Sequence, residues 1–228
     1  MARLVGTEFK VRKAAVNAAW TNVGPVSGVL LGMLAFVSLP AGALHGYWVQ
    51  FWKARNSGYR ETAIIESWTC TSLILLLVAL NLIELVPIVV VQLFALLVLL
   101  RLVDLFYVLL FLLIGNHPPK NAARAVTLLL VHYIEVVLIF GCAYLILQRL
   151  DAHRVFFLVN SQPGCLTAGE SFYFSLMTAA TVGFGDITPV LTEPVLRSIV
   201  ILEPLCLLFM TAIEIPRLLN FLPPPPVQ

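Results

Sequence analysis

Long apolar segments separated by short polar breaks occupy most of the chain, and they cover residues 23–44, 68–114, 125–147 and 194–219. A helix needs about 20 predominantly apolar residues to cross the hydrocarbon core of a membrane. The segments at residues 125–147 and 194–219 have this length, so each is predicted to be one membrane-spanning helix. Pro25 and Pro40 leave only a short uninterrupted section in the first segment, which is therefore either a full span or a tilted or re-entrant helix.

The segment at residues 68–114 is too long for a single crossing. At a rise of about 1.5 Å per residue, one helix over this segment would be roughly twice as long as the hydrocarbon core is thick. We therefore predict a hairpin of two helices, with its turn at residues 86–92, where Pro87 and Gln92 interrupt the apolar pattern. Together, the segments predict an all-α membrane protein.

The composition agrees with this fold class. Of 228 residues, 60% are hydrophobic and 11% are charged, and the mean hydropathy is +0.96, which is typical of integral membrane proteins. The net charge of +2 is small, and we expect membrane lipid rather than nucleic acid around the protein. Cytoplasmic loops are enriched in Lys and Arg. Two of the polar breaks are therefore predicted to be cytoplasmic. The first contains Lys53, Arg55 and Arg60, and the second contains Lys120 and Arg124.

The N-terminal stretch, residues 1–20, carries basic residues and is predicted to lie along the membrane interface. If residues 23–44 cross the membrane fully, this basic stretch lies outside, against the rule that positive loops stay inside. If they do not, the stretch stays inside. The sequence leaves both arrangements open.

Ligands for a metal or a cofactor are not grouped in the sequence. His132 and Glu135 have the i, i+3 spacing of two metal ligands, but no further ligand is suitably spaced, so a packing role is favoured. The 4 cysteines show no CxxC spacing, and the 4 histidines are scattered. We therefore expect neither an enzyme nor a bound cofactor.

One short stretch near the C-terminal end has alternating glycines, and it reads Thr181, Val182, Gly183, Phe184, Gly185 and Asp186. Glycine enters left-handed backbone conformations at little cost, so this spacing allows successive carbonyl groups to point the same way. A row of aligned carbonyls is a cation ligand, but one chain supplies one row and cannot surround an ion. We infer four chains around an axis, each giving its carbonyls and the Thr181 hydroxyl in place of the hydration shell.

This stretch resembles the selectivity filter of the tetrameric P-loop potassium channel superfamily, with Phe184 where tyrosine is commoner. The resemblance extends upstream through residues 172–178 as a pore helix and downstream through residues 187–189 into an inner helix. With the outer helix it covers residues 120–221. Thr167 and Glu170 have the spacing of a capping box, which predicts where the pore helix begins.

The resemblance implies that potassium is the permeant ion and binds at Thr181, Val182, Gly183 and Phe184, with Gly185 completing the filter. It also implies that side chains of the pore helix hold Asp186 from behind. The tryptophan that usually does this corresponds to Tyr173, and the carboxylate found in some members corresponds to Met177. We therefore expect one hydrogen bond, between Tyr173 and Asp186.

The inner helix lacks the glycine hinge of many relatives, but Pro204 lies one position before the place of that hinge. Proline removes a backbone hydrogen bond, so bending is predicted to centre there. Glu203, beside it, has two interpretations. It is either one of a ring of four carboxylates that concentrate cations below the filter, or a protonated or hydrogen-bonded side chain that faces the pore helix.

The hairpin resembles a degenerate voltage sensor. A sensor needs several arginines, because each charge that moves through the field contributes about 2.3 kcal/mol per 100 mV. Here Arg101 is alone, and Asp104, one turn further on, or Glu84 is placed to neutralise it. We therefore expect no strong voltage gating.

The sequence thus predicts three parts: an N-terminal part at residues 1–66, the sensor-like hairpin at 67–115, and a pore domain with a short Pro-rich tail at 116–228. We expect a homotetramer in the cell membrane that conducts potassium passively. A weakly selective cation channel, or a silent or regulatory subunit, is the alternative, and an additional regulatory subunit is a further candidate partner.

Overall fold

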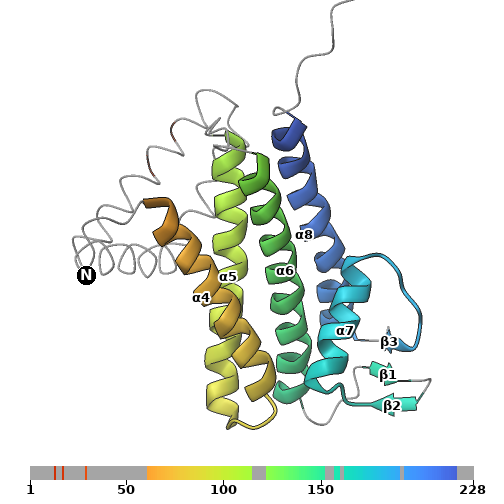
Figure 1. The fold of residues 1–228 in the computed structure, drawn as a ribbon. Helices are drawn as coiled ribbons and strands as arrows, with labels where there is room; N and C mark the ends of the chain where they lie inside the picture. Colours follow the sequence, from red (N-terminus) through yellow and green to blue (C-terminus); the bar gives the residue numbers. More distant parts are fainter. Residues whose placement is uncertain are drawn as a thin grey trace, which may run out of the picture. The chain divides into compact units, whose positions relative to one another are not determined.

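The computed structural model describes residues 13, 17, 29, 61–114, 122–151, 157–159, 162–190 and 193–219 (Figure 1). Residues 13, 17 and 29 are helical. Apart from these positions, the predictions for residues 1–20 and 23–44, for the first basic break and for the Pro-rich tail lie outside the described residues.

Helices dominate the described ranges, as the apolar pattern predicted. They are α4 (Glu61–Leu82), α5 (Ile88–Ile114), α6 (Ala122–Leu150), α7 (Ala168–Ala179) and α8 (Pro194–Leu219). Three of these helices are long and apolar enough to cross a membrane, over Ile88–Tyr107, Val126–Leu150 and Pro194–Pro216. The apolar part of α4, Trp68–Leu82, is shorter. The predicted helical membrane fold is therefore confirmed.

The predicted hairpin is present, but its turn lies earlier than the sequence suggested, at residues 83–87 rather than 86–92. Pro87 directly precedes α5, and its carbonyl accepts hydrogen bonds from Val90 N at 2.9 Å and Val91 N at 3.2 Å. Proline is tolerated at a helix start because the first N–H groups have no partner inside the helix. Pro87 therefore opens α5, and Gln92 lies inside the helix rather than in the turn.

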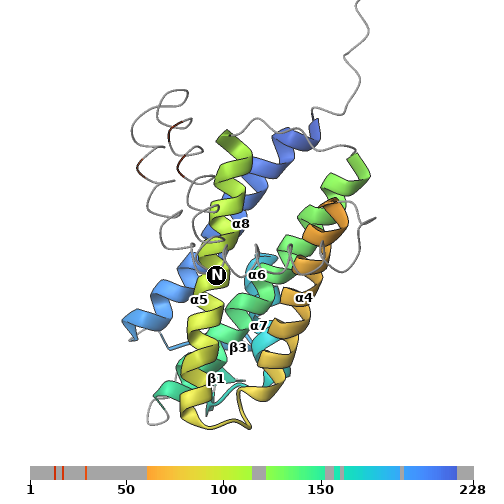
Figure 2. The same cartoon turned by 90° about the vertical axis from the view of Figure 1, so that its left-hand side faces the viewer.

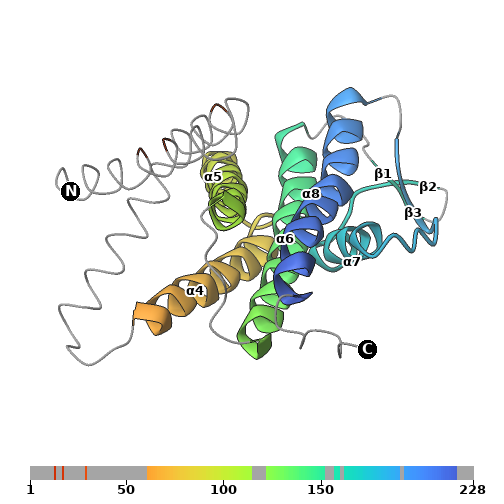
Figure 3. The same ribbon diagram turned by 90° about the horizontal axis from the view of Figure 1, so that it is seen from above.

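The chain divides into two compact units, and the hairpin contributes to both. One unit contains Met1–Leu75 and Leu99–His117, and the other contains Leu76–Val98 and Pro118–Gln228. In the second unit, α6 packs against both α7 and α8, and most residues of α6 from 135 to 146 are buried. Figures 1 and 2 show α7 near the end of this unit where α6 finishes and α8 begins, and Figure 3 shows α7 beside both helices.

A small sheet, which the sequence did not predict, follows α6. It consists of β1 (Phe157–Val159), β2 (Gln162–Gly164) and β3 (Ile187–Pro189), in the order β2-β1-β3. Both pairs are antiparallel, and Phe157 pairs with Gly164 on one side and Pro189 on the other. Because β3 begins directly after Asp186, the sheet holds the chain where it leaves the predicted filter.

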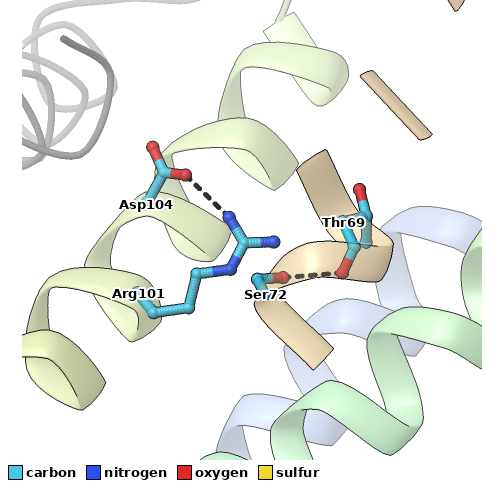
Figure 4. A network of polar contacts seen from close by, with 4 residues as sticks. All are labelled: Thr69, Ser72, Arg101 and Asp104. Carbon is cyan, nitrogen blue, oxygen red and sulfur yellow. Dashed lines mark hydrogen bonds and ion pairs between the residues drawn. The ribbon is translucent and has the colours of Figure 1, made fainter. Parts of the chain in front are cut away.

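In the first unit, the lone arginine of the sensor-like hairpin forms an ion pair within its own helix. Arg101 Nη1 lies 2.9 Å from Asp104 Oδ2, one turn further along α5 (Figure 4). The guanidinium group also points towards Ser72 of α4, whose hydroxyl donates to Thr69 O at 2.8 Å. Asp104 is therefore the partner predicted for Arg101, while Glu84, the other candidate, is exposed in the turn.

Candidate ion-conduction site

The pore helix α7 begins behind a complete N-terminal cap. Thr167 Oγ1 accepts a hydrogen bond from Glu170 N at 3.3 Å, and Glu170 Oε2 accepts one from Thr167 N at 2.8 Å, so the predicted capping box is confirmed. Immediately before it, Gln148 of α6 holds both backbone groups of Leu166. Its Nε2 donates to Leu166 O at 3.0 Å, and its Oε1 accepts from Leu166 N at 2.7 Å. The start of α7 is therefore fixed by its own cap and by the outer helix.

Two serines one turn apart fasten α7 along the outer helix. Ser171 Oγ donates to Gly141 O at 2.7 Å, and Ser175 Oγ lies 2.8 Å from Val137 O. Both serines are fully buried, and these carbonyls are also one turn apart on α6. The matching periods of the two helices therefore give a pair of polar contacts in an otherwise apolar interface, where an unpartnered hydroxyl would be costly.

The loop that follows α7 has the backbone conformation that its glycines predicted. Gly183 has φ = 58° and Gly185 has φ = 80°, and Thr181 also lies in the left-handed region with φ = 56°. Left-handed residues therefore alternate with Val182 and Phe184. A Cβ atom at Gly183 or Gly185 would meet nothing within 4 Å in the chain, so within a single chain the need for glycine comes from the backbone conformation and not from lack of space.

Thr181 holds a conformation that costs a residue with a Cβ atom roughly 1–2 kcal/mol. Hydrogen bonds to the end of α7 support it. Thr181 N donates to Thr178 O at 3.0 Å, and Val182 N donates to Met177 O at 3.0 Å. Met177 thus supports the loop through its backbone oxygen, and a carboxylate is not needed at its position for this contact.

Asp186 is held from two sides at the C-terminal end of the loop. Its Oδ1 accepts a hydrogen bond from Ile187 N at 3.0 Å, and the hydroxyl of Tyr173 on α7 donates to its carboxylate. The hydrogen bond is the main reason that the pKa of Tyr173 is raised, and burial and the charge of Asp186 act in the same direction. The structure thus brings these two side chains together, and their role in supporting the filter stays a prediction.

Replacing Tyr173 with phenylalanine removes the hydroxyl and is expected to make the filter lose conduction faster during prolonged opening. Asp186 would keep only its backbone contact among those described above, so the C-terminal end of the loop would be held less firmly. Single-channel and macroscopic recordings measure the rate. Tyr173→Phe combined with Asp186→Asn should inactivate no faster than the faster single variant, because both changes break the same bond. A Tyr173→Phe channel with wild-type inactivation contradicts this role.

Three buried aromatic rings, one of them on the pore helix, pack against one another. The ring of Tyr144 on α6 lies 5.7 Å from that of Phe157 on β1 and 5.1 Å from that of Phe174 on α7, and the latter two are 5.2 Å apart. All three pairs have edge-to-face geometry, which aromatic rings favour. The cluster therefore joins the outer helix, the pore helix and the sheet that continues from the filter.

Glu203 and Pro204 lie inside the inner helix α8. Pro204 lies inside the continuous helix, and bending at this position stays a prediction. The side chain of Glu203 is 0% exposed and is held by Tyr144 of α6 and Ser175 of α7. Of the two interpretations of Glu203, the structure agrees with the side chain that faces the pore helix, and it gives no support for a ring of carboxylates below the filter.

His132 and Glu135 of the outer helix are both buried. Among the described residues, no group of three or more His, Cys, Asp or Glu side chains is arranged to hold a metal ion. The burial of His132 and Glu135 places both side chains in the interior of the helical unit.

Sequence reasoning missed Gln148, Ser171, Ser175 and Tyr144. The apolar pattern predicts this helix only to residue 147, but α6 continues to Leu150 and carries Gln148 opposite Leu166. The only available signal was the presence of polar side chains within apolar helices, since buried polar groups need partners. That signal shows that a partner exists, but it does not identify the partner.

Comparison with known families agrees with this geometry. Residues 132–219 match the model of a family described as ion channel, and the matched segment runs from α6 through α7 and the glycine loop to the end of α8. No curated protein and no solved structure gives a significant match. The family match indicates a channel rather than an enzyme. Residues 132–219 are therefore similar to the pore module of an ion channel family, which is consistent with the expected tetrameric P-loop potassium channel superfamily.

Proposed function

We propose that the protein is a potassium-selective channel of the cell membrane, in which four copies of the chain conduct potassium passively. The observation that carries this proposal is the alternation of left-handed φ angles at Thr181, Gly183 and Gly185 at the end of a capped pore helix. Such alternation turns successive carbonyls towards one side, where they replace water around a dehydrated cation. Potassium is the permeant ion here and not a bound cofactor.

The exposure of the loop supports assembly around an axis. In the single chain, residues 181–186 are all exposed, with Val182 48% and Phe184 69% exposed. Non-helical backbone at membrane depth is tolerated only where protein buries it or where it lines a wet cavity. Neighbouring copies meet both conditions, because they cover the apolar side chains and enclose a path for ions on the other side.

The Arg101–Asp104 pair supports a channel without strong voltage gating. A moving sensor charge must be free to exchange partners across the membrane field. Arg101 instead lies 2.9 Å from a carboxylate on its own helix, so a shift of the helix moves both charges together and transfers little net charge. The hairpin then does not act as a strong voltage sensor.

Purified protein in planar bilayers, with potassium on one side and sodium on the other, tests the proposal. We expect a reversal potential close to the potassium equilibrium value and a conductance that depends weakly on voltage. A reversal potential near zero would favour the weakly selective cation channel instead. Absence of current from the purified protein alone, with current restored by a second subunit, would favour a silent or regulatory subunit.

A further inference from the structure

The carboxyl group of Glu203 is enclosed by three helices. The hydroxyl group of Tyr144 on α6 donates a hydrogen bond to Glu203 Oε2 at 2.6 Å. On the other side, Ser175 Oγ of α7 lies 2.5 Å from Glu203 Oε1 and 2.8 Å from Val137 O. These contacts link α8 to α7 and to two positions on α6.

The contacts around Glu203 need more protons than the two hydroxyl groups supply. The backbone carbonyl of Val137 can only accept, and each hydroxyl has one proton to donate. The hydroxyl proton of Tyr144 takes part in the hydrogen bond to Oε2. If the hydroxyl proton of Ser175 takes part in the hydrogen bond to Val137 O, the hydrogen bond between Ser175 Oγ and Oε1 needs a proton on Glu203. Three contacts need three protons, the two hydroxyls supply two, and a protonated Glu203 supplies the third.

The surroundings also disfavour a charged carboxylate. A buried ionised carboxylate without a cationic partner is so costly that the group becomes neutral instead. The described groups that interact with Glu203 are Tyr144 and Tyr133 of α6, Ser175 of α7 and Cys206 of its own helix. None of these side chains is basic, so none compensates a negative charge.

We infer that Glu203 is a neutral carboxylic acid and the positioning residue through which the inner helix holds the pore helix. The hydrogen bonds then run in one direction, from Tyr144 to Glu203, from Glu203 to Ser175, and from Ser175 to the carbonyl of Val137. Every donor and acceptor in this series of hydrogen bonds is satisfied. Without the proton on Glu203, the single hydroxyl proton of Ser175 faces two acceptors, Glu203 Oε1 and Val137 O, so one of these two contacts is lost.

The position of Glu203 next to Pro204 gives the link a role in the proposed channel, and this part rests on the proposed function. Pro204 has no N–H, so α8 lacks a backbone hydrogen bond at this point and bends there most easily. A bend at Pro204 displaces Glu203, and Glu203 holds Ser175, about one turn before the end of the helix that carries the filter loop. Movement of the inner helix is thereby transmitted to the filter.

Infrared spectroscopy of the purified protein tests the proton without depending on conduction. A protonated carboxylic acid has a carbonyl band at higher frequency than a carboxylate. We expect this band in the difference between the wild type and Glu203→Gln at neutral pH. Its absence at neutral pH, or its appearance only after acidification, would overturn the inference even if the protein conducts potassium.

Variants test the positioning role. Glutamine reproduces the neutral acid, because its carbonyl accepts from Tyr144 and its amide donates to Ser175, so Glu203→Gln should keep wild-type flux and assembly. Glu203→Ala and Ser175→Ala should each lower flux about tenfold, the effect of one unsatisfied buried group. The double variant should be no worse than the worse single variant. Equal loss of flux in Glu203→Gln and Glu203→Ala would contradict the link.

The pH profile separates positioning from a merely structural role. Alkaline conditions should lower the flux of the wild type, as Glu203 loses its proton, but not the flux of Glu203→Gln. Identical dependence of flux on pH in the wild type and in Glu203→Gln would overturn the proposed link between the protonation of Glu203 and conduction. If the wild type carries no current at any pH, the proposed function fails, while the infrared result still decides the protonation of Glu203.

Discussion

Replacing Gly183 or Gly185 with alanine is expected to abolish potassium-selective flux and to leave the helices folded. Both glycines have φ angles in the left-handed region, at 58° and 80°, where a residue with a Cβ atom costs roughly 1–2 kcal/mol. Four copies of the change add to about 4–8 kcal/mol within one filter. The loop is then expected to relax to another conformation, in which its carbonyls no longer line a common path.

Gly169→Ala is the matched control. Gly169 lies in the first turn of α7, and a Cβ atom there would also meet nothing within 4 Å. Alanine is favoured over glycine in a helix by up to about 1 kcal/mol, so this variant should conduct normally and unfold at a slightly higher temperature. Flux into potassium-loaded vesicles and circular dichroism measure the two effects. Wild-type selectivity in Gly183→Ala would show that left-handed backbone is not required.

Replacing Phe157 with alanine is expected to cause the largest loss of stability, about 3–5 kcal/mol of unfolding free energy. Phe157 is 0% exposed, and its ring packs edge-to-face against Tyr144 and Phe174. Its strand also pairs with β3, directly after the filter. The change therefore removes core packing, and it also weakens the sheet that holds the chain directly after the filter loop.

Thermal unfolding of the solubilised assembly, followed by circular dichroism, measures this effect. Leu85→Ala, at a side chain that is 79% exposed in the hairpin turn, provides the control and should change the unfolding free energy by less than about 0.5 kcal/mol. Phe157→Leu should lie between the two, because it keeps part of the buried volume. Equal unfolding temperatures for Phe157→Ala and Leu85→Ala would show that the aromatic cluster does not stabilise the fold.

The features predicted correctly from the sequence depend on local chemistry. The capping box needs only Thr167 and Glu170, three residues apart, and the left-handed loop needs only the conformational freedom of Gly183 and Gly185. The helical hairpin follows from the length of one apolar segment. In each case the physical cause lies within a few residues or within one composition pattern, so no tertiary contact had to be known.

The features that the sequence did not reveal depend on contacts between distant positions. Tyr144 and Glu203 are 59 residues apart, and Ser175 and Glu203 are 28 residues apart. Both interpretations of Glu203 were open, because the direction in which α8 presents this side chain depends on how the helix packs. The three strands are only three residues long each, too short for an alternating pattern to identify them. The sequence places the turn near Pro87 too late in the chain, because a proline can end one segment or open the next.

The structure of the purified assembly in thallium, a heavy substitute for potassium, tests the central claim most directly. We expect four chains around one axis, with anomalous density on that axis between the backbone oxygens of Thr181, Val182, Gly183 and Phe184. Ion density in this position, competed away by potassium but not by sodium, would agree with the proposed filter. A loop that faces lipid or packed protein, with no path for an ion between the copies, would contradict it.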